Sequence, residues 1–439
     1  MYIEKILKNK LFLKKTQNIV EKTYDKVINL TRWFKKDSAN ILKELLFGLS
    51  KAENISLSEI WRYSYKISRW VKLKNIVSSY SKFLRNEKVI SKFMWKFIHK
   101  ATKELSKNGE KVYAAVDGWD MIKEFSKSRN ISYVRDGSTG KQRRWYVLET
   151  VVAFNTKLES VPLLWELFSR RKKYKSDNNM VRKVINKVNK YISKNVDITY
   201  LFDRWYDAKA FFEFLSWLSI KFIVKMRRNR YVKVKGKTVR IDNAYAILRN
   251  LKEEVEINLK GWKKTRGRLY YWQIKIFDWN ERRKYWLVVL KNNKWSHILL
   301  TNEKITNKKD AMEVITAYSY RRIIEETYKY MKQEYDLEYM HIRDSKKNQE
   351  LQMIRMNNLY NLLLASIWLS MLWLEMLWKQ DKEILLEIRS IDYIGYRLKN
   401  LIWWWLDVLK AVIMKWNFLQ SRTQRYRLKI QQKSLFCLN

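Results

Sequence analysis

Residues 112–117 read VYAAVD, and residues 198–203 read ITYLFD. In each segment a short apolar run, of the kind that forms a buried strand, ends at an aspartate. Side chains just beyond the carboxyl ends of strands line the crevice of an α/β sheet. For one such aspartate alone, a loop acid or a helix cap would be the simpler interpretation. Because two carboxylates at neighbouring strand ends can share divalent cations, the pair Asp117 and Asp203 predicts a catalytic site.

The segments around these two runs predict an alternation of strands and helices. Strands are expected at 112–116, 145–155, 159–168, 198–202 and 221–226, and helices at 178–194 and 208–219. In chain order this gives three strands, a helix, a strand, a helix and a strand. That is the order of an RNase H-like α/β core.

The rest of the chain is expected to be helical at both ends and β-rich in the middle. Residues 240–305 alternate apolar and polar positions, with a hairpin of 269–277 and 285–290 around 278–280. Near the start, a helix is expected from Asp37 or Ser38 to Phe47, closed by Gly48. A capping box at Ser56 and Glu59 starts another helix through Trp70. These two helices are compatible with a helix-turn-helix, although any helical bundle gives the same pattern.

A domain plan follows from these patterns. It has a helical DNA-binding region (1–105), the first part of the core (106–240), a β-rich insertion (241–308), a core helix (309–350) and a helical C-terminal region (351–439).

A third acid stands in residues 317–336, AYSYRRIIEETYKYMKQEYD. On a continuous helix, Tyr318, Arg321, Glu325 and Lys332 fall within a sector of about 60°, whereas Glu326 is rotated by about 100° from Glu325. A carboxylate flanked by cations and a phenol suits a metal ion that holds a phosphate. The alternative is an exposed face with ordinary Glu–Lys pairing.

The net charge predicts a polyanionic partner. The 439 residues include 91 Lys and Arg against 44 Asp and Glu, a formal charge of +47. Nucleic acid is therefore the first partner to consider and a membrane surface the second. The longest apolar stretch, about 359–378, is interrupted by Asn361 and Glu375, so we expect a buried helix and no membrane.

Metal chemistry, if present, must rest on carboxylates. The chain has one cysteine and three widely separated histidines, so a thiolate or histidine cluster is not expected. Carboxylates favour hard ions such as Mg²⁺ or Mn²⁺. The first 15 residues have no clean apolar run, so no signal peptide is expected.

The motifs together resemble a known family. Tyr318, Arg321, Glu325 and Lys332 match Y-x2-R-x3-E-x6-K, the signature of DDE transposases of the insertion-sequence-four type. DGWDMIK at 117–123 resembles the family's first-aspartate segment, D-x-x-D-x-x-K, and DRWYD at 203–207 resembles its second, usually D-R-G-F/Y-D. The resemblance covers roughly residues 105–350, and Trp205 departs from the usual glycine.

The resemblance implies a DNA transposase that cuts transposon ends and joins them to target DNA. Asp117, Asp203 and Glu325 would hold two Mg²⁺ or Mn²⁺ ions, with Asp120 and Asp207 outside the metal ligands. Contacts to DNA phosphates would come from Tyr318, Arg321, Lys332, Arg204 and Lys123. It further implies a homodimer on paired ends of double-stranded DNA, in the cytoplasm of a bacterium and associated with the nucleoid. The alternatives are a two-metal nuclease without strand transfer and a catalytically inactive DNA-binding protein.

Tryptophan is in excess and glycine is scarce. There are 21 Trp and 9 Gly, and their sum is close to an ordinary glycine share of about 7%. Trp279 lies in an expected tight turn, Trp205 replaces the family's glycine, and Trp262 and Trp295 lie in polar loops. We interpret many of these tryptophan positions as being encoded by UGA, a codon that the source organism reads as glycine. The alternative is a Trp-rich core, and Trp368, Trp373 and Trp378 do follow helical spacing.

Overall fold

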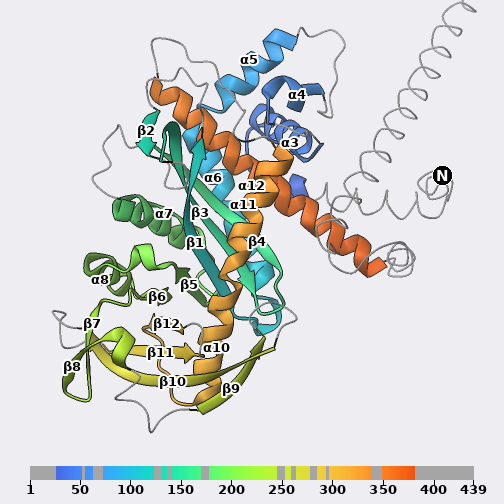
Figure 1. The fold of residues 1–439 in the computed structure, drawn as a ribbon. Coiled ribbons are helices and arrows are strands. Elements are labelled where there is room, and N and C mark those ends of the chain that lie inside the picture. The colour runs from blue at the N-terminus through green and yellow to red at the C-terminus, as the bar shows by residue number, and fades with distance from the viewer. Residues whose placement is uncertain are drawn as a thin grey trace, which may run out of the picture. The chain divides into compact units, whose positions relative to one another are not determined.

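The structure is a computed structural model of the 439-residue chain. It describes residues 26–51, 55–62, 73–122, 131–135, 140–169, 177–244, 253–258, 264–276, 284–292, 296–335, 337 and 349–380. The chain divides into two compact units, Lys36–Ala365 and Met1–Lys35 with Ser366–Asn439. The sheet and the candidate site lie in the first unit (Figure 1).

Twelve strands of the described residues form one mixed sheet. Its first part contains β1 (Val112–Ile122), β2 (Ser132–Arg135), β3 (Gln142–Asn155), β4 (Ser160–Phe168), β5 (Ile198–Phe202) and β6 (Lys221–Lys225). Within it the order is β4–β3–β1–β5–β6, where β3 is antiparallel to β1 and the neighbours β1, β5 and β6 are parallel. Val116 lies opposite Phe202, so the aspartates that follow these residues lie at the same edge of the sheet.

Helices cover both faces of the sheet. On one face lie α7 (Asp177–Tyr191) and α8 (Lys209–Trp217), and Phe202 packs on Phe211 of α8 with ring centroids 5.0 Å apart. On the other face α10 (Lys308–Ser319) and α11 (Ile323–Tyr335) share a buried cluster with Leu201. Because side chains alternate along a strand, Asp203 faces α10 and α11, as Leu201 does.

The predicted β-rich insertion extends the same sheet. Within 241–308 it contains β9 (Glu253–Asn258), β10 (Lys264–Ile276), β11 (Tyr285–Lys291) and β12 (Ser296–Thr301). β7 (Tyr231–Val234) and β8 (Lys237–Arg240) join the same part of the sheet but lie before residue 241, which the sequence did not predict. β12 pairs antiparallel with β6, and β11 and β10 follow it. The predicted pairing of β10 with β11 is confirmed, with Leu269 opposite Leu290, while residues 278–280 lie outside the described part.

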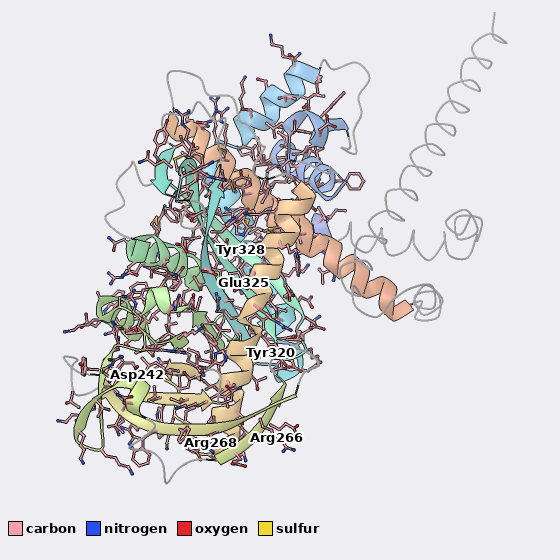
Figure 2. All side chains as sticks on the ribbon, viewed as in Figure 1. Asp242, Arg266, Arg268, Tyr320, Glu325 and Tyr328 are labelled. Atoms are coloured by element: carbon pink, nitrogen blue, oxygen red, sulfur yellow. The ribbon has the colours of Figure 1, made fainter. Side chains whose placement is uncertain are left out.

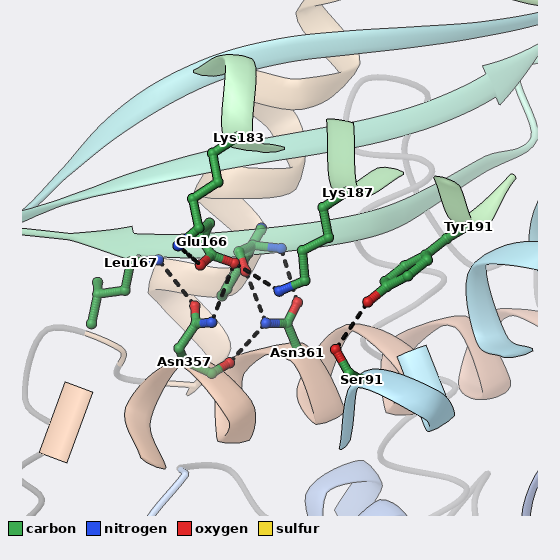
Figure 3. Close-up of polar contacts among 9 residues, drawn as sticks. Ser91, Glu166, Leu167, Lys183, Lys187, Tyr191, Asn357 and Asn361 are labelled. Atoms are coloured by element: carbon green, nitrogen blue, oxygen red, sulfur yellow. Dashed lines mark hydrogen bonds and ion pairs between the residues drawn. The ribbon is translucent and has the colours of Figure 1, made fainter. Parts of the chain in front are cut away.

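The outer edge of β4 is closed by asparagines of α12 (Gln349–Gln380) (Figure 3). The backbone N–H of Trp165 donates to Asn361 Oδ1 at 3.0 Å, and Asn361 Nδ2 donates to the Trp165 carbonyl at 2.8 Å. Two residues along, the N–H of Leu167 donates to Asn357 Oδ1 at 3.0 Å. Buried backbone groups need partners, and these side chains take the place of a neighbouring strand.

The buried Glu166 adds charge to this edge. Its carboxylate accepts from Lys183 at 3.0 Å and from Lys187 at 2.9 Å, both on α7. Burial would raise the pKa of Glu166, but the two ammonium groups outweigh it and hold the pKa below its usual value. A buried carboxylate is tolerated here because it is paired twice.

The N-terminal part of this unit is helical, as expected. Its helices are α3 (Lys36–Lys51), α4 (Leu57–Arg62), α5 (Leu73–Phe83) and α6 (Glu87–Leu105). The prediction that Gly48 ends the first helix was wrong, because α3 continues to Lys51. Gly48 lies against Ile60 of α4, where a Cβ atom would overlap the Ile60 carbonyl oxygen. Residues 63–72, which include the expected end of the second helix at Trp70, lie outside the described part.

Two other expectations need correction. β1 does not end at Val116 but continues to Ile122, because residues 117–122 stay paired with β3, so Asp117 and Asp120 lie within the strand. The continuous helix assumed for residues 317–336 is interrupted by the 3-10 turn η5 (Tyr320–Arg322) between α10 and α11. β2, which pairs with the start of β3, was not predicted. The described residues also contain the 3-10 turns η1 (Lys107–Gly109), η2 (Arg204–Tyr206) and η3 (Ile241–Asn243).

The tryptophans differ widely in exposure. Trp205 and Trp217 are 71% and 76% exposed, whereas Trp165 and Trp368 are buried. Trp262, Trp279 and Trp295 lie outside the described residues, and the side chains of Trp373 and Trp378 are not described. In the helices that the structure describes, no segment has both the length and the apolar character needed to cross a bilayer.

Candidate active site

Asp117 and Asp203 come together at one edge of the sheet. Asp117 lies in β1 directly after Val116, the last residue paired with β5, and Asp203 directly follows β5. Both side chains face α10 and α11, because they continue the alternation of Ala115 and Leu201 in the buried cluster on that face. Two acids from segments 86 positions apart in sequence therefore meet beneath one helical segment.

Arg321 connects Asp117 to Glu325. Its Nη1 donates to Asp117 Oδ2 at 3.0 Å, and its Nη2 donates to Glu325 Oε1 at 2.9 Å. The arginine side chain is 12% exposed, Asp117 is 23% exposed and Glu325 is 61% exposed. The planar guanidinium of Arg321 thus places a positive charge between the half-buried Asp117 and the exposed Glu325.

Two tyrosines of the same helical segment contact the two aspartates. The Tyr328 hydroxyl donates to the Asp117 carbonyl at 2.8 Å, and the Tyr318 hydroxyl reaches Asp203 Oδ1 at 3.5 Å. Figure 2 shows Glu325 and Tyr328 on α11. Tyr328 lies three residues after Glu325, which is helical spacing for the same face, so the sequence carried a signal for it.

Burial and charge act together on the ionisation of Asp117. Burial raises the pKa of this carboxyl, Arg321 lowers it, and the nearby Asp203 raises it again, so the pKa stands above its usual value. Burial likewise raises the pKa of Tyr318, which keeps its hydroxyl protonated beside Asp203. Two interacting carboxylates and a paired arginine are the kind of group that shifts pKa values at functional sites.

The other predicted phosphate-binding residues lie at different distances from the acids. Lys332 lies over the ring of Trp119, with Nζ 4.3 Å from its centroid, and Trp119 packs on Tyr328. Arg204 directly follows Asp203 and is exposed, whereas Lys123 lies outside the described residues. The structure therefore brings Tyr318, Arg321, Glu325 and Lys332 to the face of β1 that carries Asp117.

The segment after Asp203 is held by contacts that the sequence did not predict. The Tyr206 hydroxyl donates to the buried Glu149 at 3.1 Å, and burial, with Glu149 adding, raises the pKa of Tyr206. Asp207 is buried, accepts the backbone N–H of Arg227 at 2.8 Å, and pairs with Arg230 Nε at 2.6 Å. DRWYD showed an acid at 207, but its partners are 20 and 23 residues away in sequence.

The donor set fits a hard divalent cation. Asp117, Asp203 and Glu325 offer only carboxylate oxygens, which suit Mg²⁺ or Mn²⁺. Asp203 acts on the pKa of Asp117, and Arg321 contacts both Asp117 and Glu325. Within the described part of the chain, no three His, Cys, Asp or Glu side chains are already grouped as a metal site. Arg321 instead links two of the three acids.

The family model described as the transposase DDE domain matches residues 115–362, more than half of the chain and a range that includes all three acids. A search of curated proteins finds none that matches. Among solved structures, the chain is similar to a cryo-EM structure of a piggyBac transposase synaptic complex with hairpin DNA. The sequence identity is 9% and the TM-score 0.36, over 84% of this chain and 76% of that one.

Proposed function

The chain belongs to the family of transposases with a DDE domain, and from this premise we propose that it cuts transposon ends and joins them to target DNA. One observation carries the proposal. Asp117 and Asp203 share one edge of the sheet, and Arg321 links Asp117 to Glu325 above them. This arrangement of three carboxylates and a cation supports a site that binds and cuts a phosphodiester.

In this proposal the acids hold the metal and the cations hold the DNA. Asp117, Asp203 and Glu325 would hold two Mg²⁺ or Mn²⁺ ions, which would activate the attacking oxygen and stabilise the leaving one. Arg321 can turn one or both guanidinium nitrogens from the carboxylates to a phosphate, because such a fork suits both anions. Lys332, Arg204 and Lys123 would bind neighbouring phosphates, and Tyr318 would position the strand end beside Asp203.

We further propose that the chain is of the insertion-sequence-four type. Tyr318, Arg321, Glu325 and Lys332 fit its spacing, and all four lie on the helical segment over Asp117. The order β4–β3–β1–β5–β6, with β3 antiparallel, supports an RNase H-like core.

The domain plan and the partners are part of the same proposal. The plan keeps 1–105 as the DNA-binding region, 106–240 and 309–350 as the core, 241–308 as the insertion and 351–439 as the C-terminal region. The partner would be double-stranded DNA, bound by a homodimer at paired ends in the bacterial cytoplasm.

A plasmid assay tests the proposal. The full chain is incubated with Mg²⁺ and a plasmid that carries the DNA flanking its own gene, together with a second plasmid as target. We expect cuts at the two flanking ends and covalent joining of those ends to the target. Cuts without joining would indicate a nuclease that does not transfer strands. Binding without cuts would indicate an inactive DNA-binding protein, and either result would contradict the proposal.

A further inference from the structure

A basic cavity lies beside the candidate active site. It has a volume of about 700 Å³, and Arg204 and Trp205, which directly follow Asp203 in sequence, form part of its wall. The turn after β6, the end of β8 and the start of β12 supply the rest. The lining residues are Arg204, Trp205, Lys225, Met226, Arg227, Arg228, Asn229, Arg240, Ser296 and Ile298.

The cavity has a strong excess of positive charge. Five of the ten lining residues are Lys or Arg, and none is Asp or Glu. Arg240 is paired with Asp242, which Figure 2 labels, at 2.9 Å. In the described part of the chain, the side chains of Arg204, Lys225, Arg227 and Arg228 form no ion pair. Four like charges around one cavity repel one another unless an anion is bound.

The arrangement of these cations is built into the fold. Asp207 accepts the backbone N–H of Arg227 and pairs with Arg230, whose Nη2 also donates to the Asp207 carbonyl at 2.9 Å. Arg227 Nε in turn donates to the Arg204 carbonyl at 3.4 Å. The turn that carries Arg227 and Arg228 is thereby tied to the segment that follows Asp203. Asp207 thus fixes the backbone of this turn, while the side chains of Arg227 and Arg228 stay exposed. Such an arrangement suits a binding site for anions.

We propose that this cavity binds backbone phosphates of the DNA strand next to the bond cut at Asp117, Asp203 and Glu325. The inference rests on the proposed function and adds to it a second phosphate site, made by Lys225, Arg227, Arg228 and Arg240 together with Arg204. Because contacts to backbone phosphates carry no sequence information, we expect binding at this site to be independent of sequence. Free polyphosphates share this chemistry, so the experiment must separate the two sources.

The salt dependence of DNA binding tests this site. Affinity of the full chain for a short duplex is measured from about 50 to 200 mM salt, for the parent and for R227Q/R228Q. Each lost phosphate contact lowers the slope of log affinity against log salt by about 0.9, so we expect a decrease of about 1.8. R227K/R228K keeps the charges and should keep most of the slope. Because both arginines are exposed, these changes should not disturb folding.

A matched pair of lysines serves as the control. Lys190 and Lys194 are exposed and precede the opposite, amino-terminal end of β5, so K190Q/K194Q should leave the slope close to that of the parent. An equal decrease in both double variants would show a general charge effect and overturn the site. An unchanged slope in R227Q/R228Q would overturn it as well.

Two further arms separate the remaining outcomes. ADP is titrated into the parent. Binding of ADP that R227Q/R228Q abolishes, together with an unchanged DNA slope, would assign the cavity to free nucleotides and overturn the proposal. Cleavage by D203N is measured in parallel. If D203N loses cleavage and R227Q/R228Q keeps the parental slope, the proposed phosphate site is refuted but the proposed function is not. Full cleavage by D203N refutes the proposed function itself.

Discussion

Replacing Asn361 by alanine should destabilise the unit that holds the sheet by about 3 kcal/mol. The change removes both partners of the Trp165 backbone, whose N–H and carbonyl are bonded to Asn361 at 3.0 and 2.8 Å. Trp165 is fully buried and Asn361 is 2% exposed, so water does not replace the lost partners. Each orphaned group costs roughly 1–3 kcal/mol, and two of them give roughly 2–6 kcal/mol. We expect the lower half of that range, because the structure around an alanine relaxes in part.

Urea unfolding followed by tryptophan fluorescence measures this effect. N357A is the matched control, because it removes a single bond to the backbone, that of Leu167, at a position that is partly buried. It should cost about 1 kcal/mol. A free energy of unfolding for N361A within about 0.5 kcal/mol of the parent, or a larger loss in N357A, would refute the idea that these asparagines close the edge of β4.

R321Q should bind Mn²⁺ about tenfold more tightly than the parent in the absence of DNA, because Arg321 competes for the carboxylate oxygens of Asp117 and Glu325. Calorimetry measures this, and equal or weaker binding would contradict it. The free energy of unfolding of the parent, compared with that of D117N, should fall as pH rises from the ordinary aspartate pKa through the raised pKa of Asp117. The reason is that the folded protein binds the proton of Asp117 more tightly than the unfolded chain does. Urea unfolding across pH checks the direction, and a difference that rises with pH would show the opposite shift. The gene should carry UGA at codon 205 and at other tryptophan positions, with glycine in the native protein by mass spectrometry, whereas UGG at codons 119, 205, 262, 279 and 295 would exclude this interpretation.

Much of the sheet could be predicted because its strands carry local signals. The apolar runs at 112–116 and 198–202 form buried strands, and the alternating segments of the insertion pair as β10 and β11. The sequence did not show that the insertion continues the same sheet through β12 and β6. That pairing depends on contacts between Leu299 and Lys225, which are 74 positions apart and carry no local pattern.

The corrections arose where tertiary packing overrides a local rule. Glycine commonly follows the end of a helix, yet Gly48 lies inside α3. The neighbouring Ile60 of α4 explains a glycine there, because its carbonyl oxygen leaves no space for a Cβ atom. Asp117 was expected just beyond a strand, yet β3 keeps β1 paired up to Ile122. After Val116, β1 is no longer paired with β5 but stays paired with β3. The continuous apolar run marks only the part of the strand that is buried on both faces.

The candidate site was predictable in its acids but not in its supports. Spacing on a helix placed Arg321 and Glu325 together, and their contact at 2.9 Å agrees with it. The continuous helix assumed in that argument is interrupted at Tyr320–Arg322, where side chains three residues apart align more closely than in an α-helix. The roles of Glu149 and Asp207 come from partners distant in sequence, so the motif alone did not reveal them.

Mg²⁺-dependent cleavage of the plasmid with flanking ends, measured for E325Q and for E326Q, tests whether Glu325 is the third catalytic acid. Both glutamates are exposed and adjacent, but Glu325 contacts Arg321, whereas Glu326 lies 4.0 Å from Arg322. If Glu325 joins Asp117 and Asp203 in catalysis, E325Q should lose cleavage by at least about a hundredfold while it still binds DNA, and E326Q should cut like the parent. Cleavage by E325Q at the parental rate would contradict the account.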